Sequence, residues 1–192
     1  MLEIRIHGRG GQGVVTAAEL LSVAAFDDGY HAQAFPSFGS ERTGAPVVAF
    51  CRIDSRRIRT REPISEPDAL IIVDPTLLHQ VDVFAGAQPT ADVLVNTSHD
   101  LDELGISAAA ISERRQVGRV LAVPATELAR LHLGRPLPNA ALLGGFAALT
   151  SAVSLASVVR AIRERFTGTV ADGNAAAAEA AYEAVVGAAT HA

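Results

Sequence analysis

The sequence predicts an α/β fold built on an open sheet with flanking helices, and two observations carry that prediction. Residues 2–7 alternate apolar and polar side chains, as a half-buried strand does, and a glycine-rich stretch at 8–13 and an Ala- and Leu-rich stretch at 14–26 follow at once. Residues 69–73 form a continuous apolar run, which suits a strand buried on both faces of a parallel sheet. The order strand, glycine turn, helix is that of a Rossmann-like open sheet.

Two further strands are expected in the first half. Residues 30–35 can form a second strand, which the right-handed crossover rule places parallel to and beside the first. Residues 45–53 are a strong strand candidate, and a turn at Asp54 leads into residues 56–60. This pattern predicts a β-hairpin inserted into the sheet.

The second half is predicted to be mainly helical, in a single domain that spans 1–192. Short strands are expected at 92–95 and 119–123. Ser154 and Asn174 are candidate N-caps for two of the helices. No charged residue occurs between Leu137 and Val159, which predicts an apolar face that partners cover. The helices are expected at 125–133, 139–151, 154–166 and 174–189.

The composition of the 192-residue chain excludes several classes of function. All sixteen basic residues are arginine, so a Walker A ATPase, a Schiff-base enzyme and a kinase are excluded because each needs a lysine. The net charge of −5 argues against nucleic-acid binding. The single Cys51 can form neither an internal disulfide nor an iron–sulfur site by itself. Without a targeting or membrane-spanning segment, the expected location is the cytoplasm.

The glycine-rich stretch is the first candidate site. Gly8, Gly10 and Gly13 follow the G-x-G-x-x-G spacing between a predicted strand and a predicted helix, where free N–H groups favour an anion. Dinucleotide binding also needs an acidic residue at the end of the second strand, and residues 30–35 contain none. The motif is therefore interpreted in two ways, as tight packing of helix on strand or as an anion or subunit-interface site.

A polar loop at residues 38–46 is the second candidate site. It places an acid, a base and two hydroxyl groups between glycines, and Arg42 could grip a carboxylate or phosphate with two hydrogen bonds. The simpler alternative is a solvated surface loop. Loops at strand ends of α/β folds are also where ligands bind.

The sequence also contains a run of arginines at 52–61 and six scattered histidines. Arg57, Arg59 and Arg61 would share one face of a strand, where they could protect a sheet edge from aggregation or meet an acidic partner or coenzyme phosphate. Arg52 and Arg56 precede them. The histidines show no metal-ligand spacing, so no metal site and no catalytic residue is assigned.

Two motifs together resemble the gamma subunit of the 2-oxoacid:ferredoxin oxidoreductases, in a form closer to the pyruvate branch than to the 2-oxoglutarate branch. The first is the stretch at 8–17 and the second is the stretch at 38–47. The resemblance covers residues 1 to about 185. The site residues that it implies, for cofactor binding or subunit contact, are Gly8, Gly10, Gly11, Gln12, Gly13, Ser40, Glu41, Arg42, Thr43 and Gly44.

The resemblance implies a subunit that does not catalyse the reaction alone. In that family a 2-oxoacid such as pyruvate is decarboxylated oxidatively, the acyl group passes to coenzyme A and electrons pass to ferredoxin or a similar acceptor. Thiamine diphosphate, magnesium and [4Fe-4S] clusters would lie on alpha, beta and delta subunits. The gamma subunit would have a structural role on the coenzyme A side.

Two other functions stay open from the sequence. One is a free-standing Rossmann-type enzyme that uses NAD(P), against which the missing acid at 30–35 counts. The other is a nucleotide-sensing regulatory module, which would be a stable ligand-binding chain by itself.

Overall fold

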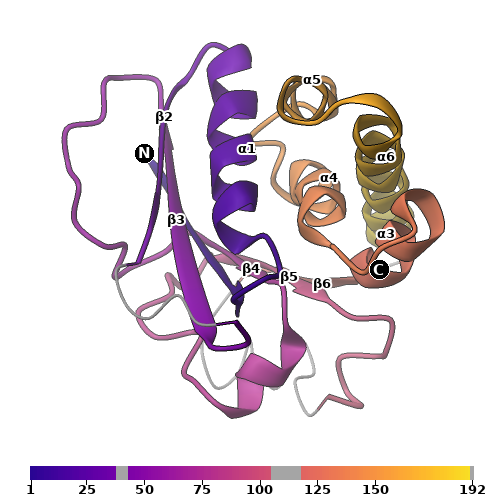
Figure 1. The fold of residues 1–192 in the computed structure, drawn as a ribbon. Coiled ribbons are helices and arrows are strands. Elements are labelled where there is room, and N and C mark those ends of the chain that lie inside the picture. Colours follow the sequence, from indigo (N-terminus) through magenta and orange to yellow (C-terminus); the bar gives the residue numbers. More distant parts are fainter. Residues whose placement is uncertain (38–42, 105–117, 191–192) are drawn as a thin grey trace.

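The computed structural model describes residues 1–37, 43–104 and 118–190, and within them a six-stranded sheet carries five α-helices on one face (Figure 1). The strands are β1 (Leu2–Arg9), β2 (His31–Pro36), β3 (Pro46–Asp54), β4 (Ala69–Ile72), β5 (Asp92–Asn96) and β6 (Val120–Val123). The helices are α1 (Val14–Asp27), α3 (Ala125–Leu133), α4 (Asn139–Thr150), α5 (Leu155–Arg165) and α6 (Gly168–Thr190), with a 3-10 helix η1 (Pro75–His79). The α/β class and the helical C-terminal half are confirmed.

The sheet is parallel from β1 through β4 and β5 to β6, but its first half is antiparallel. The strand order is β2-β3-β1-β4-β5-β6. The predicted strand at 30–35 exists as β2 and runs parallel to β1, but it does not lie beside it. Strand β3 lies between them, pairs antiparallel with both, and matches β1 along its whole length from Leu2 opposite Ile53 to Arg9 opposite Pro46. A long antiparallel strand therefore takes the position that the crossover rule gave to β2.

The second arm of the hairpin predicted at residues 45–60 is absent. The carboxylate of Asp54 accepts a hydrogen bond from the backbone N–H of Arg56 at 2.9 Å, which turns the chain out of the sheet. Residues 57–60 belong to no helix or strand. The antiparallel pair is instead β2 with β3, so the arginine run does not protect a sheet edge.

The main core lies between the sheet and the helices. Ile4 and Ile6 of β1, Ile71 of β4 and Leu94 of β5 are fully or almost fully buried beneath α1 and α4. Cys51 of β3 is buried in the same layer, and burial raises the pKa of its thiol to about 12. This thiol is therefore protonated and inert at neutral pH.

The uncharged stretch between Leu137 and Val159 does not form an exposed apolar face, so that expectation was wrong. It contains α4, in which every residue from Asn139 to Ala147 is buried. The other helices and the sheet surround α4 on all sides (Figure 1). A helix that is apolar around its whole circumference is a central helix, and the chain itself provides its cover.

Of the two helix caps predicted from the sequence, one is confirmed and one is wrong. Ser154 caps α5 as expected, because its hydroxyl accepts a hydrogen bond from the N–H of Ser157 at 3.1 Å. Asn174 does not cap α6, which begins six residues earlier at Gly168; its side chain donates to the carbonyl of Val170. The buried Gly173 lies close against the last turn of α3, so tertiary packing extends the helix past the local capping signal.

The other face of the sheet is covered by η1 and irregular segments, within the described residues. Leu70 and Ile72 of β4 pack there against Leu77 and Val83. The buried Arg5 donates to the carbonyls of Val83 and Ala85, each at 2.8 Å, and to Nε2 of His7 at 3.1 Å. Burial, together with the charge of Arg5, lowers the pKa of His7 to about 3.

A methyl group at Gly144 should destabilise the fold because it would overlap the backbone oxygen of Ala178 in α6. We expect Gly144→Ala to lower the free energy of unfolding by about 1–3 kcal/mol in urea titration. Gly145→Ala is the matched control, because its methyl group would meet only side chains, at 3.2 Å and beyond. Equal effects of the two substitutions would contradict the close approach of α4 to α6.

His7 should make the protein less stable in mild acid. The unfolded chain takes up a proton at this imidazole below about pH 6.5, whereas the folded protein keeps it neutral down to about pH 3. The free energy of unfolding should therefore fall as the pH drops from 6.5 to 5, with a contribution of up to about 1.4 kcal/mol per pH unit. In His7→Gln, which keeps an acceptor for Arg5, that contribution should vanish in chemical denaturation at each pH.

Candidate functional site

The glycine loop between β1 and α1 needs glycine for two different physical reasons. Gly11 and Gly13 have φ angles of +94° and +73°, which residues with a Cβ atom rarely adopt. Gly8 needs space instead, because a methyl group there would press on Val14 and Val73. A methyl group on Gly13 would also collide with the side chain of Asn139 in α4. The predicted glycines therefore set both the turn and the packing of α1.

The two predicted loops meet at Gly10. Its N–H donates to the carbonyl of Ala45 at 2.9 Å, and its carbonyl accepts from the N–H of Gly44 at 3.1 Å. Thr43 forms an isolated β-bridge with the same glycine. The structure thus brings together Gly8 to Gly13 with Thr43 and Gly44. Ser40, Glu41 and Arg42 lie outside the described residues, and their role stays a prediction.

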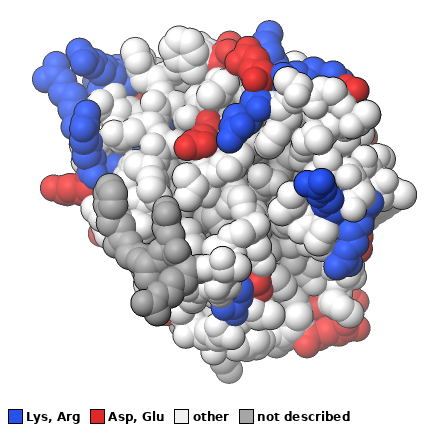
Figure 2. Space-filling view, in the orientation of Figure 1, with Lys and Arg blue, Asp and Glu red and all other residues white. Residues whose placement is uncertain are grey.

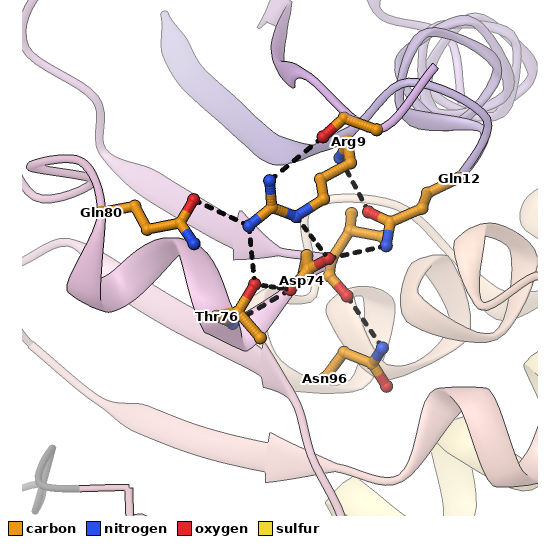
Figure 3. A network of polar contacts seen from close by, with 8 residues as sticks. Arg9, Gln12, Asp74, Thr76, Gln80 and Asn96 are labelled. Atoms are coloured by element: carbon orange, nitrogen blue, oxygen red, sulfur yellow. Dashed lines mark hydrogen bonds and ion pairs between the residues drawn. The ribbon is translucent and has the colours of Figure 1, made fainter.

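Arg9 and Asp74 join the ends of β1 and β4 (Figure 3). Nε of Arg9 lies 3.1 Å from Oδ2 of Asp74, and the same oxygen accepts from Nε2 of Gln12 at 2.8 Å. The other guanidinium nitrogens of Arg9 donate to the carbonyl of Gly44 and to the side chains of Thr76 and Gln80. One ion pair therefore holds β1, the 43–45 segment and η1 together.

The electrostatics of Asp74 follow from this network. Partial burial by itself would raise the pKa of its carboxyl, but hydrogen bonds from Thr76 and Gln12 and the charge of Arg9 outweigh burial and lower it. The crevice at the carboxyl ends of parallel strands is where α/β folds commonly bind ligands. Here the side chains of Arg9, Gln12 and Asp74 bind one another between the ends of β1 and β4.

The first turn of α1 borders two cavities. Gly13 occupies the N-cap position, no side chain caps the helix, and its first turn contains no acidic residue. Its first N–H groups therefore lack intrahelical partners and carry a partial positive charge. The first cavity, of about 430 Å³, lies between the glycine loop, Thr43 and Val47. The second, of about 540 Å³, lies between the glycine loop and the helices α3, α4 and α6.

The second cavity is lined by cationic and amide groups that the sequence did not single out as a site. Arg135 and Arg165 are exposed at its rim, and neither forms an ion pair with a described residue. The Arg165 guanidinium lies 5.5 Å from the ring centroid of Phe166. Asn139 is only 7% exposed, and its side-chain amide has no hydrogen-bond partner among the described residues. Arg135 lies in the short segment between α3 and α4, Asn139 begins α4 and Arg165 ends α5, so the sequence alone does not show that Arg165 reaches the same cavity as the other two.

Comparison with known proteins agrees with this geometry. The family profile described as pyruvate ferredoxin/flavodoxin oxidoreductase matches residues 3–184. A similar curated protein is the pyruvate/ketoisovalerate oxidoreductases common subunit gamma of Thermococcus kodakarensis, 47% identical over 97% of this chain and 98% of that one. The chain belongs to the pyruvate ferredoxin/flavodoxin oxidoreductase family. It is a gamma subunit of a multi-subunit 2-oxoacid oxidoreductase.

Two solved structures share the fold of this gamma subunit. The pyruvate oxidoreductase subunit PORC of Thermotoga maritima is 33% identical, with a TM-score of 0.79 over 95% of both chains. A 2-oxoglutarate:ferredoxin oxidoreductase of Magnetococcus marinus matches with a TM-score of 0.71 and 17% identity, over 97% of this chain and 31% of that one. In the second protein the same fold is therefore one part of a longer chain.

The described residues offer neither a metal-binding cluster nor a membrane-spanning helix. No group of three or more His, Cys, Asp or Glu side chains among them could hold a metal ion. No helix among residues 1–37, 43–104 and 118–190 is long and apolar enough to cross a membrane.

Replacing Asp74 should loosen the glycine loop. Asp74→Asn removes the charge that Arg9 and Gln12 share, and we expect a loss of about 1–3 kcal/mol in the free energy of unfolding. Asp92→Asn, which breaks the surface ion pair with Arg119, is the control and should cost less than about 1 kcal/mol. Faster amide hydrogen exchange at residues 8–13 in Asp74→Asn alone would show that the ion pair holds this loop; identical exchange in both variants would contradict it.

Proposed function

We propose that this gamma subunit serves the oxidation of pyruvate or a similar 2-oxoacid by binding the phosphate-bearing part of coenzyme A in the second cavity. The observation that carries the proposal is the meeting of Arg135, Arg165 and the unpartnered amide of Asn139 beside the uncapped start of α1. Phosphate groups favour such a combination of guanidinium groups and free backbone N–H groups.

The size and position of the cavity support a nucleotide-like ligand. Its volume of about 540 Å³ falls within the range of ordinary ligand pockets. His132 and Asn174 also line it and could contact phosphate oxygens or the base. The Magnetococcus marinus protein is described with 2-oxoglutarate, coenzyme A and succinyl-CoA bound, so a complex of this fold works with that coenzyme.

The remaining chemistry belongs, in this proposal, to partner chains. Thiamine diphosphate with magnesium and the [4Fe-4S] clusters would lie on alpha, beta and delta subunits, and ferredoxin or a similar carrier would accept the electrons. The single Cys51 supports this division of labour, because it is buried in the core with a raised pKa. The location of the complex in the cytoplasm remains the expectation from sequence.

The two other functions considered from sequence receive less support. An NAD(P) enzyme would need the space between the ends of β1 and β4, where Arg9 and Gln12 instead bind Asp74. It would also need a ribose-binding acid at the end of β2, and residues 31–36 contain none. A regulatory nucleotide sensor would act as a chain by itself, whereas the similar curated proteins are subunits of multi-subunit oxidoreductases.

Removing the charge of the two arginines at the second cavity should weaken the binding of coenzyme A and not that of the 2-oxoacid. In the purified multi-subunit enzyme, Arg135→Gln with Arg165→Gln should raise the KM for coenzyme A by about tenfold or more, because each charged hydrogen bond contributes about 1.5–3 kcal/mol. The KM for the 2-oxoacid should stay unchanged. Steady-state assays with each substrate varied in turn measure both constants.

A second substrate and a matched variant sharpen this test. Dephospho-coenzyme A lacks the 3′-phosphate, so a defect that shrinks with this substrate assigns the arginines to that phosphate, whereas a defect that persists assigns them to the diphosphate. Arg163→Gln, which removes an exposed arginine of α5 paired with Asp172, is the control and should leave both KM values unchanged. If the double variant also keeps the wild-type KM for coenzyme A, the proposal is wrong.

A further inference from the structure

A cluster of unpaired positive charge lies in the segment that follows β3, here called the arginine segment. It comprises residues 56–61 and contains four exposed arginines and no acidic residue. Figure 2 shows the basic side chains that gather at the upper left of the molecule, over the loop after β3. None of the four guanidinium groups forms an ion pair or hydrogen bond with a described residue. The arginines are Arg56, Arg57, Arg59 and Arg61.

The backbone around this segment is fixed at both ends. At the start, Asp54 accepts the N–H of Arg56 at 2.9 Å. At the end, Arg52 donates to the carbonyl of Glu62 at 2.6 Å, and Arg52 is itself buried and paired with Glu3 at 2.7 Å. Ile64, just beyond, is only 3% exposed. The like charges are therefore presented by an anchored loop.

Of the six exposed arginines elsewhere in the described residues, three are neutralised within the chain, and the other three do not crowd into one short segment as residues 56–61 do. Arg119 pairs with Asp92, Arg160 with Asp27 and Arg163 with Asp172. The chain as a whole carries a net charge of −5. Like charges that crowd in one loop repel one another, and a facing set of carboxylates would relieve that repulsion.

The arginine segment is separate from the candidate site. It leaves β3 at the end where Ile53 lies opposite Leu2, whereas the glycine loop leaves β1 at the end where Arg9 lies opposite Pro46. An eight-residue strand spans about 25 Å, so the two surfaces lie at opposite ends of the sheet.

We propose that the arginine segment is a docking surface for an acidic patch on another subunit of the oxidoreductase. The proposal rests on the proposed function, since it takes the partner from the multi-subunit complex. An acidic protein fits better than a nucleic acid, because the net charge of the chain repels a long polyanion. It also fits better than a second copy, since two copies would each carry a net charge of −5.

The test compares two variants of the assembled complex, from which the same amount of positive charge is removed at different positions. The chain is co-expressed with the other subunits of its oxidoreductase, and sedimentation velocity on serial dilution gives the apparent Kd for its release. One variant carries Arg57→Gln, Arg59→Gln and Arg61→Gln. The control carries Arg119→Gln, Arg130→Gln and Arg163→Gln, which removes the same charge from other exposed positions.

The expected result is a salt-dependent loss of assembly in the first variant alone. Its Kd should rise by about tenfold or more in dilute buffer, and the difference from wild type should shrink near 0.5 M NaCl, where the Debye length falls to roughly 4 Å. Replacing the same three arginines by glutamate should weaken assembly beyond the glutamine variant, which a loss of packing alone would not do.

Three outcomes would overturn the proposal, and they differ in what else they affect. An unchanged Kd in the glutamine variant rejects the docking surface and leaves the proposed function intact. A change only in self-association of the isolated chain assigns the segment to a second copy instead. Failure of the wild-type chain to assemble with those subunits rejects both this inference and the proposed function.

Discussion

The ion pair between Arg9 and Asp74 is the interaction on which the arrangement at the carboxyl ends of β1 and β4 depends. It lies where β1 and β4 both end, and each partner also binds the loops that leave those strands. Because Arg9 donates to Gly44, Thr76 and Gln80 as well, the glycine loop and residues 43–45 are held against each other. The ends of β1 and β4, where other α/β proteins commonly bind a ligand, are therefore held together here by side chains of the protein itself.

The second cavity, where we propose that a ligand binds, lies on the helix side of the glycine loop. The start of α1 keeps its free N–H groups, and Gly13 allows Asn139 of the central helix α4 to lie directly against it. Helices α3 and α5 end nearby, so Arg135, just after α3, and Arg165, the last residue of α5, border the same cavity. The anion site that we propose would thus lie where several helices converge, and it would need no acidic ribose-binding residue.

The chain also separates two kinds of surface. Near the glycine loop, cationic groups line a cavity of small-molecule size. At the other end of the sheet, the four arginines of the arginine segment are exposed, and Arg52 and Ile64 anchor the segment. If the two proposals hold, the coenzyme and the larger partner would bind at separate places, because the length of a strand lies between the two surfaces.

The sequence by itself determined the fold class, most elements and the glycine loop, because each has a local cause: alternation in β1, continuous apolar residues in β4, and left-handed turns that only glycine accepts readily. It also carried the family resemblance that the comparisons confirm. Only the tertiary structure decided that β3 lies between β1 and β2, that α4 is buried, and that α6 begins before Asn174. It alone paired Arg9 with Asp74 and brought Arg135 and Arg165 to one cavity. Those outcomes depend on contacts between residues far apart in the chain, whose free energies outweigh the smaller local preferences that a sequence pattern reports.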